Sequence, residues 1–447
     1  MNHPSWAERD RRALWHPCTP TRDLDDLPPI PIRSARGVWL EAYDGRRYLD
    51  AISSWWVNLF GHAHPVINAA IRDQLERLEH VMLAGFTHEP VIRLSERLAA
   101  LTGLGHSYYA SDGSAAVEIA LKMSFHYWRN RGEHRRTRYI CLANSYHGET
   151  LGALSVSDVG LYRQVYEPLL LQPLVAPSPD AYVRADGESA ADVARRQMSV
   201  LEHLLDRHAG EVCAVIVEPL VQCAGGMRMH DPLYLRLLRA ACDRHRVHLI
   251  ADEIAVGFGR TGTMFACEQA GIRPDLLLLG KGLTGGYLPL SVCLVSDEIY
   301  NAFDSEHGSP AAFLHSHSYT GNALACAAAN ATLDLFESGD VLARNRELAA
   351  HLARATAPLA DHAHVAEIRQ TGMILAIEMA RDGKTRTPYP AAERRGRRVY
   401  RYALEQGALL RPLGDVIYFM PPYVIEPDEI DQLARIAADG IAQATTD

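Results

Sequence analysis

Two short apolar runs in the middle of the chain each lead to a charged residue. Val247–Ala251 is followed directly by Asp252. Leu276–Leu279 is followed, after one glycine, by Lys281. Apolar runs of this length, bounded by Gly and Pro, are typical of strands buried on both faces of a parallel sheet. Because ligands bind beyond the carboxyl ends of such strands, we expect Asp252 and Lys281 to face one crevice.

An isolated acid and amine in one crevice fit the cofactor pyridoxal 5′-phosphate. Its aldehyde can form a Schiff base with a lysine amine, and a carboxylate across the ring keeps the pyridine nitrogen protonated. A salt bridge between Asp252 and Lys281, without any cofactor, would explain the two residues equally well. The segment 257–262 also matches a dinucleotide-binding pattern. It neither follows a strand directly nor opens a clearly capped helix, so we expect no nicotinamide or flavin site.

A phosphate could bind where a helix begins after another strand. Residues 106–110 have a strand pattern, and the next residues, SDGS, open a strongly helical segment. Free N–H groups and the positive end of the helix dipole attract an anion there, so Gly113 and Ser114 are candidate phosphate ligands. An ordinary helix N-cap, which Ser and Asp favour, is the alternative.

A second small, polar segment precedes the helical stretch that begins near residue 323. It contains His315, Ser316, His317 and Ser318, and its hydroxyl groups offer another potential phosphate contact. Its two histidines suggest metal ligands, as does an H-A-H-P segment earlier in the chain. No further ligands lie at a fitting spacing, so we predict no metal site.

Aromatic residues near other predicted strand ends could contact a flat ring. Tyr146 comes shortly after the strand-like segment Arg138–Leu142, and it could stack on a pyridine ring, as could its neighbour His147. Trp55 and Trp56 are adjacent. Neighbours on a strand point to opposite sides, so one of the two rings could line a pocket, although simple packing of both is equally compatible.

Two charged residues lie in apolar surroundings. Arg411 belongs to an apolar segment that we predict to be a strand. A buried arginine needs an anion, and either a protein carboxylate or a substrate carboxylate would fit its fork-shaped guanidinium. Glu218 follows the strand-like segment Cys213–Val217. It should lie at the same sheet edge as Asp252, as a gate or as a hydrogen-bonding group beside the site.

Composition excludes several classes of protein. The chain has 447 residues, a net charge of −9 and no long basic run, so we expect neither nucleic acid nor an anionic membrane surface as a partner. It has no apolar run long enough for a membrane span and no apolar core of signal-peptide length near its start. The eight scattered cysteines, without a C-x-x-C motif, predict reduced thiols and a cytoplasmic location.

The pattern of elements divides the chain into three parts. Residues 1–60 are irregular apart from one hairpin, residues 61–335 alternate strands with helices, and residues 336–447 combine helices with short strands. We therefore expect an α/β protein, with a large domain from 61–335 and a small α+β domain from 336–447. The N-terminal segment 1–60 should pack with the small domain.

Six motifs occur in an order that resembles a known family. They are SDGS, YHG, EP, ADEI…GFGRTG, LGKGLTGG and SYTGN, and they extend over nearly the whole chain. In this order they are similar to the class III aminotransferases of PLP fold type I. The resemblance implies a mostly parallel, seven-stranded sheet between helices in the large domain. It also implies pyridoxal phosphate as the cofactor and a homodimer with shared active sites.

The resemblance assigns cofactor roles to five residues. Lys281 would be the catalytic residue and would hold the cofactor covalently. Asp252 would hold the pyridine nitrogen, and Tyr146 would stack near the ring. Gly113 and Ser114 would bind the phosphate.

Five further residues receive roles at the subunit boundary and in the substrate pocket. His317 and Ser318 would reach the phosphate of the other subunit. Trp55 and Arg411 would hold the substrate, Arg411 by its carboxylate. Ser316 would line the same pocket, in which Tyr146 and Lys281 also contact the substrate.

Several segments narrow the resemblance within the family. LWHPCT, SSWW, HVMLAGFTH and RPLGDVIYFMPPYVI are most similar to members that convert the keto acid 8-amino-7-oxononanoate to 7,8-diaminononanoate in biotin biosynthesis. S-Adenosylmethionine would be the amino donor. Cys18, a further substrate-pocket residue, stands where many members have a tyrosine, and this weakens the argument for that donor. Another ω-aminotransferase acting on a diamine or β-amino acid, an aminomutase, and a non-enzymatic scaffold are the alternatives.

Overall fold

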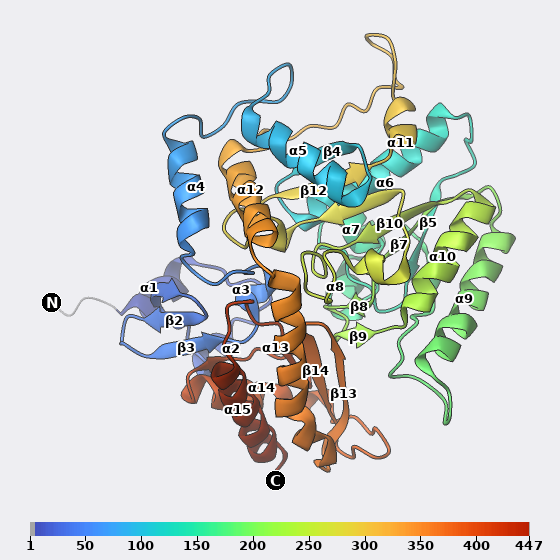
Figure 1. Ribbon diagram of the computed structural model, residues 1–447. Coiled ribbons are helices and arrows are strands. Elements are labelled where there is room, and N and C mark those ends of the chain that lie inside the picture. Colours follow the sequence, from blue (N-terminus) through green and yellow to red (C-terminus); the bar gives the residue numbers. More distant parts are fainter. Residues whose placement is uncertain (1–4, 447) are drawn as a thin grey trace.

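The structure is a computed structural model that describes residues 5–446 (Figure 1). Residues 1–4 and 447, the outer ends of the predicted N-terminal segment and small domain, lie outside the described residues. Figure 1 shows a large part built on a central sheet, with a smaller C-terminal part below it. The N-terminal segment lies beside that smaller part. None of the helices in the described part of the chain is long and apolar enough to cross a membrane.

The central sheet has seven strands in the order β4-β12-β11-β10-β7-β5-β6. β12 runs antiparallel to both of its neighbours, and the other strand pairs are parallel. The predicted mostly parallel, seven-stranded sheet is therefore confirmed. The strands are β4 (His106–Ala110), β5 (Arg138–Leu142), β6 (Leu174–Ala176), β7 (Val212–Val217), β10 (His248–Asp252), β11 (Leu276–Leu279) and β12 (Ser291–Val295).

Both faces of the middle of this sheet are buried, which explains why strands such as β7 and β11 are apolar throughout. Leu277 and Leu279 of β11 pack into one core cluster, and Leu276 and Leu278 pack into another. Successive side chains of a strand point to opposite faces, so each face needs its own cover. Helix α6 (Gly113–Asn130) contributes to one cluster, whereas α9 (Ala190–Arg207) and α10 (Pro232–His245) contribute to the other.

Shorter elements complete the large part. The helices are α4 (Pro65–Leu75), α5 (Glu89–Thr102), α7 (Leu151–Ser155), α8 (Gly160–Arg163), α11 (Asp297–Asn301) and α12 (Ala323–Ser338). Single 3₁₀ turns are η1 (Gln164–Leu169), η2 (Ala266–Ala270) and η3 (Lys281–Thr284), and β8 (Val221–Gln222) pairs with β9 (Arg228–Met229).

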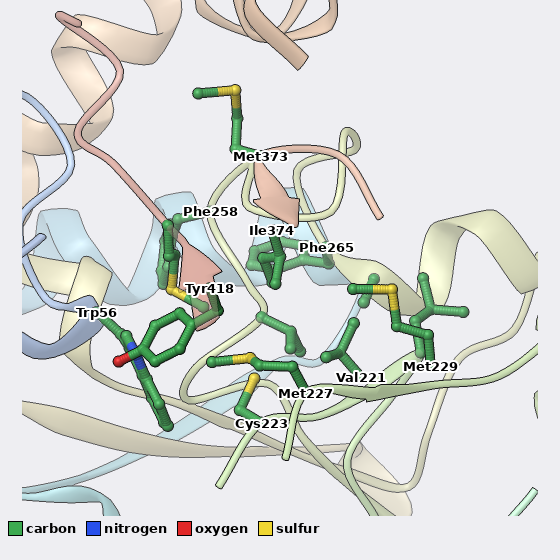
Figure 2. Close-up of a cluster of buried hydrophobic side chains, with 14 of the residues drawn as sticks. Trp56, Val221, Cys223, Met227, Met229, Phe258, Phe265, Met373, Ile374 and Tyr418 are labelled. Carbon is green, nitrogen blue, oxygen red and sulfur yellow. The ribbon is translucent and has the colours of Figure 1, made fainter. Parts of the chain in front are cut away.

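The C-terminal part packs helices on a three-stranded antiparallel sheet. Its strands are β13 (Val365–Thr371), β14 (Ile374–Met379) and β16 (Val416–Phe419). Its helical elements are α13 (Val341–Thr356), η4 (Ala357–Asp361), η5 (Ala391–Glu393), α14 (Arg395–Glu405) and α15 (Pro427–Thr445). Figure 2 shows where Ile374 and Tyr418 of this sheet meet Cys223 and Met227 of the large part in one apolar cluster.

A second, four-stranded sheet connects the two ends of the chain. Its order is β1-β2-β3-β15, and β15 (Ala408–Leu409) pairs in parallel with β3 (Arg47–Asp50). The N-terminal segment thus shares a sheet with a strand of the C-terminal part, while the boundaries at residues 60 and 335 remain predictions. The other elements are α1 (Trp6–Ala13), α2 (Asp23–Asp26), β1 (Ile32–Arg36), β2 (Trp39–Ala42) and α3 (Ser53–Trp56).

Candidate active site

A cavity lies beyond the carboxyl ends of β7, β10 and β11. Glu218 follows β7, Asp252 ends β10, and Lys281 follows β11 after one residue. All three line a cavity of about 160 Å³. Asp252 and Lys281 therefore face one crevice, as the sequence predicts. The lining consists of Trp56, Asp112, Gly113, Ser114, Tyr146, His147, Gly148, Glu218, Cys223, Asp252, Ile254, Ala255, Val256 and Lys281.

The Lys281 amine lies in a poorly hydrated environment. Burial lowers the pKa of Lys281, an effect that the nearby negative charge of Asp252 partly opposes. Its Nζ lies 5.5 Å from the centre of the Trp56 ring. A lower pKa leaves more of the amine neutral near pH 7, and a neutral amine can act as a nucleophile and as a base.

The Asp252 carboxylate is held in place from two sides. Its Oδ1 accepts the Ile254 N–H at 3.1 Å, and its Oδ2 lies 2.7 Å from Nδ1 of His147. The side chains of Asp252 and His147 are almost completely buried. The neighbouring Glu218 accepts the N–H groups of Tyr146 and Cys223 at 2.9 and 3.0 Å. Burial nevertheless raises the pKa of Glu218 to about 7.

The start of α6 forms a narrow cradle. Asp112 caps the helix by accepting the Ala115 N–H at 3.0 Å. Ser114 Oγ accepts the Glu149 N–H at 3.1 Å, so its own hydroxyl proton remains available to a bound group. A Cβ atom on Gly148 would lie 2.0 Å from Ser114 Oγ, and a Cβ atom on Gly113 would lie 3.0 Å from the Ile254 side chain. Both glycines leave space that a side chain would fill.

These groups fit pyridoxal phosphate. The helix start offers N–H groups and a hydroxyl to a phosphate, Asp252 offers a fixed carboxylate to a pyridine nitrogen, and Lys281 offers an amine to an aldehyde. Among residues 5–446, no group of three or more His, Cys, Asp or Glu side chains could hold a metal ion.

Tyr146 stands at the wall of the cavity in contact with a second tyrosine. Its hydroxyl donates to Glu149 Oε1 at 2.9 Å, and its ring centre lies 5.5 Å from that of Tyr162. Tyr162 belongs to α8 and lies close to Cys18 and Arg411. Burial raises the pKa of Tyr162 to about 12. The wall beside Tyr146 is therefore aromatic even though Cys18 supplies no ring.

Three of the predicted substrate residues, Trp55, Arg411 and Cys18, lie together outside the cavity lining. The Arg411 guanidinium lies over the Trp55 ring at 4.9 Å and donates to the backbone oxygen of Cys18 at 3.3 Å. Within residues 5–446, no carboxylate forms a salt bridge with Arg411. The expectation that Arg411 lies on a strand is wrong, because β15 already ends at Leu409. The fork of the guanidinium remains available to an incoming carboxylate.

The prediction for the two tryptophans also needs correction. Residues 53–56 do not continue a strand; all four have positive φ values, between 45° and 76°. Trp56 is buried, whereas 37% of the Trp55 surface is exposed. The two rings do point to different environments, but a left-handed turn separates them instead of strand alternation.

Ser316, His317 and Ser318 do not line the cavity of this chain. They lie between α11 and α12, where Ser316 and Ser318 are exposed. The Ser318 carbonyl oxygen is 2.7 Å from Nε2 of His80. The His317 Nε2 atom is buried without a hydrogen-bond partner among the described residues.

Comparison with known proteins identifies the family. The family model for class-III aminotransferases matches residues 22–441. The chain belongs to the class-III aminotransferases. Enzymes of this family transfer amino groups with pyridoxal phosphate as the cofactor, so the predicted enzyme class, fold and cofactor are confirmed.

Three similar proteins extend over almost the entire chain. The adenosylmethionine-8-amino-7-oxononanoate aminotransferase of Helicobacter pylori is 47% identical over 95% of this chain and 94% of its own length. The crystal structure of the enzyme of that name from Methanocaldococcus jannaschii has a TM-score of 0.93 at 37% identity, covering 98% of this chain and 99% of that one. An amine transaminase from an uncultivated Pseudomonas species, solved with PLP bound, has a TM-score of 0.92 at 33% identity, covering 97% and 99%.

Sequence reasoning missed two residues of this aminotransferase site. His147 was expected to stack on a ring or to be a loop histidine, yet it contacts Asp252 through Nδ1. Tyr162 was not singled out at all. The sequence around it, GLYRQVY, contains no motif that would have indicated a site.

A second, larger hollow is lined by other residues. It measures about 450 Å³, and its lining includes Arg394 and two arginines of α14, Arg397 and Arg401. These arginines pair with Asp23 and Asp26 of α2. Each of these arginines thus already has a carboxylate partner, and none of the predicted site residues lines the hollow.

Proposed function

We propose that this aminotransferase converts 8-amino-7-oxononanoate to 7,8-diaminononanoate, with S-adenosylmethionine as the amino donor, as a step of biotin biosynthesis. The observation that carries the proposal is the Arg411 guanidinium above Trp55, beside a cavity that contains Lys281 and Asp252. A guanidinium that forms no salt bridge with any carboxylate of residues 5–446 suits a substrate with a carboxylate at its far end. The names of the relatives from Helicobacter pylori and Methanocaldococcus jannaschii support the choice of keto acid.

Three residues would hold the phosphate and the pyridine nitrogen of the cofactor. When bound, pyridoxal phosphate supplies an aldehyde carbon that carries the amino group between two substrates and a ring that withdraws electrons. Gly113 and Ser114 bind the phosphate by backbone N–H and hydroxyl donation. Asp252, fixed by His147 and the Ile254 N–H, holds a proton on the pyridine nitrogen.

Lys281 performs the proton transfer. Its amine is buried, and the resulting decrease in pKa lets it take a proton from a substrate carbon at neutral pH. Asp252 limits this decrease, because its charge favours the protonated amine. The same lysine returns the proton when the amino group passes to the keto acid.

The acceptor would be oriented by residues on the solvent side of the cavity. Arg411 binds the carboxylate, the Trp55 ring packs against the alkyl chain, and Tyr146 covers the reacting end. Cys18 and Tyr162 border the same wall. In this arrangement, a linear keto acid would place its carboxylate at Arg411 and its carbonyl carbon at Lys281.

We further propose a homodimer in which Ser316, His317 and Ser318 serve the partner subunit. Support comes from the buried, unpartnered Nε2 of His317 and from the exposed apolar side chains of Leu314 and Tyr319 beside it. We also propose a cytoplasmic location, because all eight cysteines are free thiols.

A donor screen tests the proposed reaction. The protein is loaded with pyridoxal phosphate and given 8-amino-7-oxononanoate together with S-adenosylmethionine, a diamine or a β-amino acid, and the diamino product is measured by mass spectrometry. We expect product with S-adenosylmethionine and none with the Lys281→Ala variant. No product with any donor would refute the proposal.

The screen also addresses the alternative of another ω-aminotransferase. This alternative is favoured by the absence of an aromatic ring at Cys18 and by the similarity to the Pseudomonas amine transaminase. Reaction of a diamine or β-amino acid with a simple keto acid, without any reaction of 8-amino-7-oxononanoate, would establish it. Turnover of one substrate without a separate donor would indicate an aminomutase instead.

A further inference from the structure

The segment Ser53–Trp56 forms a left-handed turn, which we call the tryptophan turn. Its four φ values are 51°, 45°, 76° and 73°, although none of its residues is a glycine. The Trp56 N–H donates to the Ile52 carbonyl at 2.8 Å, and the Val57 N–H donates to the Ser53 carbonyl at 3.1 Å. Left-handed conformations are unfavourable for L-residues, normally occur singly, and persist only where the surroundings enforce them.

The tryptophan turn sends its two rings to different parts of the site. Trp56 is buried, donates from Nε1 to the Tyr418 hydroxyl at 3.0 Å, and forms a wall of the cavity near Lys281. Figure 2 shows the Trp56 ring beside that of Tyr418. Trp55 lies on the outside, under the Arg411 guanidinium. A right-handed or extended backbone here would direct the two side chains elsewhere.

One buried carboxylate holds this turn. Asp50, at the end of β3, has no exposed surface. Its Oδ1 accepts the N–H groups of Ile52 and Ser54 at 3.2 and 2.9 Å, and its Oδ2 accepts the Ser54 hydroxyl at 2.7 Å. Nε2 of His62 lies 3.1 Å from the same Oδ2. Hydrogen bonds to a charged acceptor are stronger than neutral ones, so they can stabilise an otherwise unfavourable backbone.

The far end of the turn packs directly on the loop that carries Lys281. A Cβ atom on Gly286 would lie only 2.7 Å from backbone atoms of Val57 and Asn58. The Leu59 N–H also donates to the Gly285 carbonyl, at 3.4 Å. The residues that follow the turn, Val57–Leu59, are therefore anchored on the lysine loop, whereas the turn itself carries the two tryptophans.

We propose that Asp50 is the positioning residue that keeps the tryptophan turn left-handed and so sets Trp55 and Trp56 for the acceptor. This inference rests on the proposed function for its substrate, but not for its structural basis. Asp50 does not line the cavity and acts only through the turn. Removing its carboxylate leaves the N–H groups of Ile52 and Ser54 without their acceptor, and the turn relaxes to ordinary dihedral angles.

The test compares Asp50→Ala with the double variant Asp50→Ala/Ser54→Gly. We expect Asp50→Ala to raise the KM for 8-amino-7-oxononanoate by about tenfold, with a smaller effect on kcat and unchanged affinity for pyridoxal phosphate. Glycine adopts positive φ without a steric penalty. Adding Ser54→Gly should therefore reverse much of the increase in KM in the double variant, although it restores no contact to residue 50.

Asp44→Ala is the matched control. Asp44 lies in the turn of the same β2–β3 hairpin, and its one ion-pair partner within residues 5–446 is the exposed Arg46, so its removal should leave KM unchanged. An unchanged KM in Asp50→Ala would overturn the proposal. The proposal would also be overturned if Ser54→Gly did not lower the raised KM of Asp50→Ala at all. An increase in KM caused by general loss of structure would not respond to a glycine at that position.

A measurement without substrate separates this inference from the proposed function. The difference in fluorescence between a protein and its Trp55→Phe variant reports on Trp55 alone. The quenching of this difference signal by acrylamide can be followed in the cofactor-free protein. We expect Asp50→Ala to change this quenching and Ser54→Gly to reverse the change. If the wild type does not convert 8-amino-7-oxononanoate, the proposed function is refuted but the role of Asp50 is not. Unchanged quenching in Asp50→Ala would refute the role of Asp50 whatever the substrate is. Asp50→Asn replaces Asp50→Ala if the latter does not fold. It keeps the side-chain volume and a neutral acceptor oxygen and removes only the charge, so it should raise KM less than Asp50→Ala, but still above the wild-type value.

Discussion

Replacing Gly148 with alanine should weaken cofactor binding through a single methyl group. Gly148 has φ +128°, and its new Cβ would lie 2.0 Å from Ser114 Oγ and 2.8 Å from Ser114 Cβ. Both distances are far below van der Waals contact, so Ser114 must move from the cradle at the start of α6. The positive φ adds a second penalty, because it is unfavourable for any residue with a Cβ atom.

The size of the effect follows from the lost hydrogen bond. A hydrogen bond to a charged group contributes about 1.5–3 kcal/mol, which corresponds to about 10- to 100-fold in affinity for pyridoxal phosphate. The left-handed backbone should destabilise the fold by a further ~1–2 kcal/mol. We expect Gly148→Ala to fold, to unfold at lower urea concentration than the wild type, and to bind the cofactor within this range of weaker affinity.

The assay is a titration of cofactor-free protein with pyridoxal phosphate, followed by absorbance, together with urea unfolding. Gly132→Ala is the control, because Gly132 also has a positive φ, +79°, but no atom within 4 Å of the new Cβ. It should lose stability without losing cofactor affinity. A folded Gly148→Ala protein that binds the cofactor as tightly as the wild type would refute the assignment of Ser114 to the phosphate.

Three further predictions address other residues of the site. Burial raises the pKa of Glu218 to about 7, above its ordinary value of about 4.3, so its contribution to stability is complete below pH ~4 and is lost as the pH rises towards 7. In cofactor-free protein, the free energy of unfolding of Glu218→Gln, measured with urea, should therefore rise by on the order of 3 kcal/mol relative to that of the wild type between pH 4 and pH 8. A difference between the two proteins that does not vary with pH would contradict this. Arg411→Ala should raise the KM for the keto acid by about 10- to 100-fold, while Arg398→Ala, at an exposed arginine of α14, should not; equal effects would rule out a carboxylate contact. Tyr162→Ala should raise the KM for the amino donor by about two- to tenfold and Tyr162→Phe should not, because the ring next to Tyr146 provides the wall; a loss with Tyr162→Phe would assign the role to the hydroxyl instead.

The sequence alone was sufficient for the parts of this protein that depend on local pattern. The apolar runs before Asp252 and Lys281 predicted two buried strands, and a parallel sheet necessarily brings the ends of such strands to one edge. The segment around Gly113 and Ser114 predicted a helix start for the same kind of reason, since small polar residues before a periodic apolar stretch favour a cap. These features need only the strand, the helix and their direction.

Tertiary structure decided the contacts between segments that are distant in the chain. Arg411 reaches Trp55 because β15 pairs with β3, and no periodicity in either segment indicates that pairing. His147 meets Asp252 because the loop after β5 reaches the end of β10, a contact that the spacing of the two residues in the sequence does not indicate. The left-handed turn at Ser53–Trp56 could not be predicted from local preference, which opposes it. It exists because the hydrogen bonds of the buried Asp50 and the packing of the Lys281 loop outweigh the backbone preference of each residue.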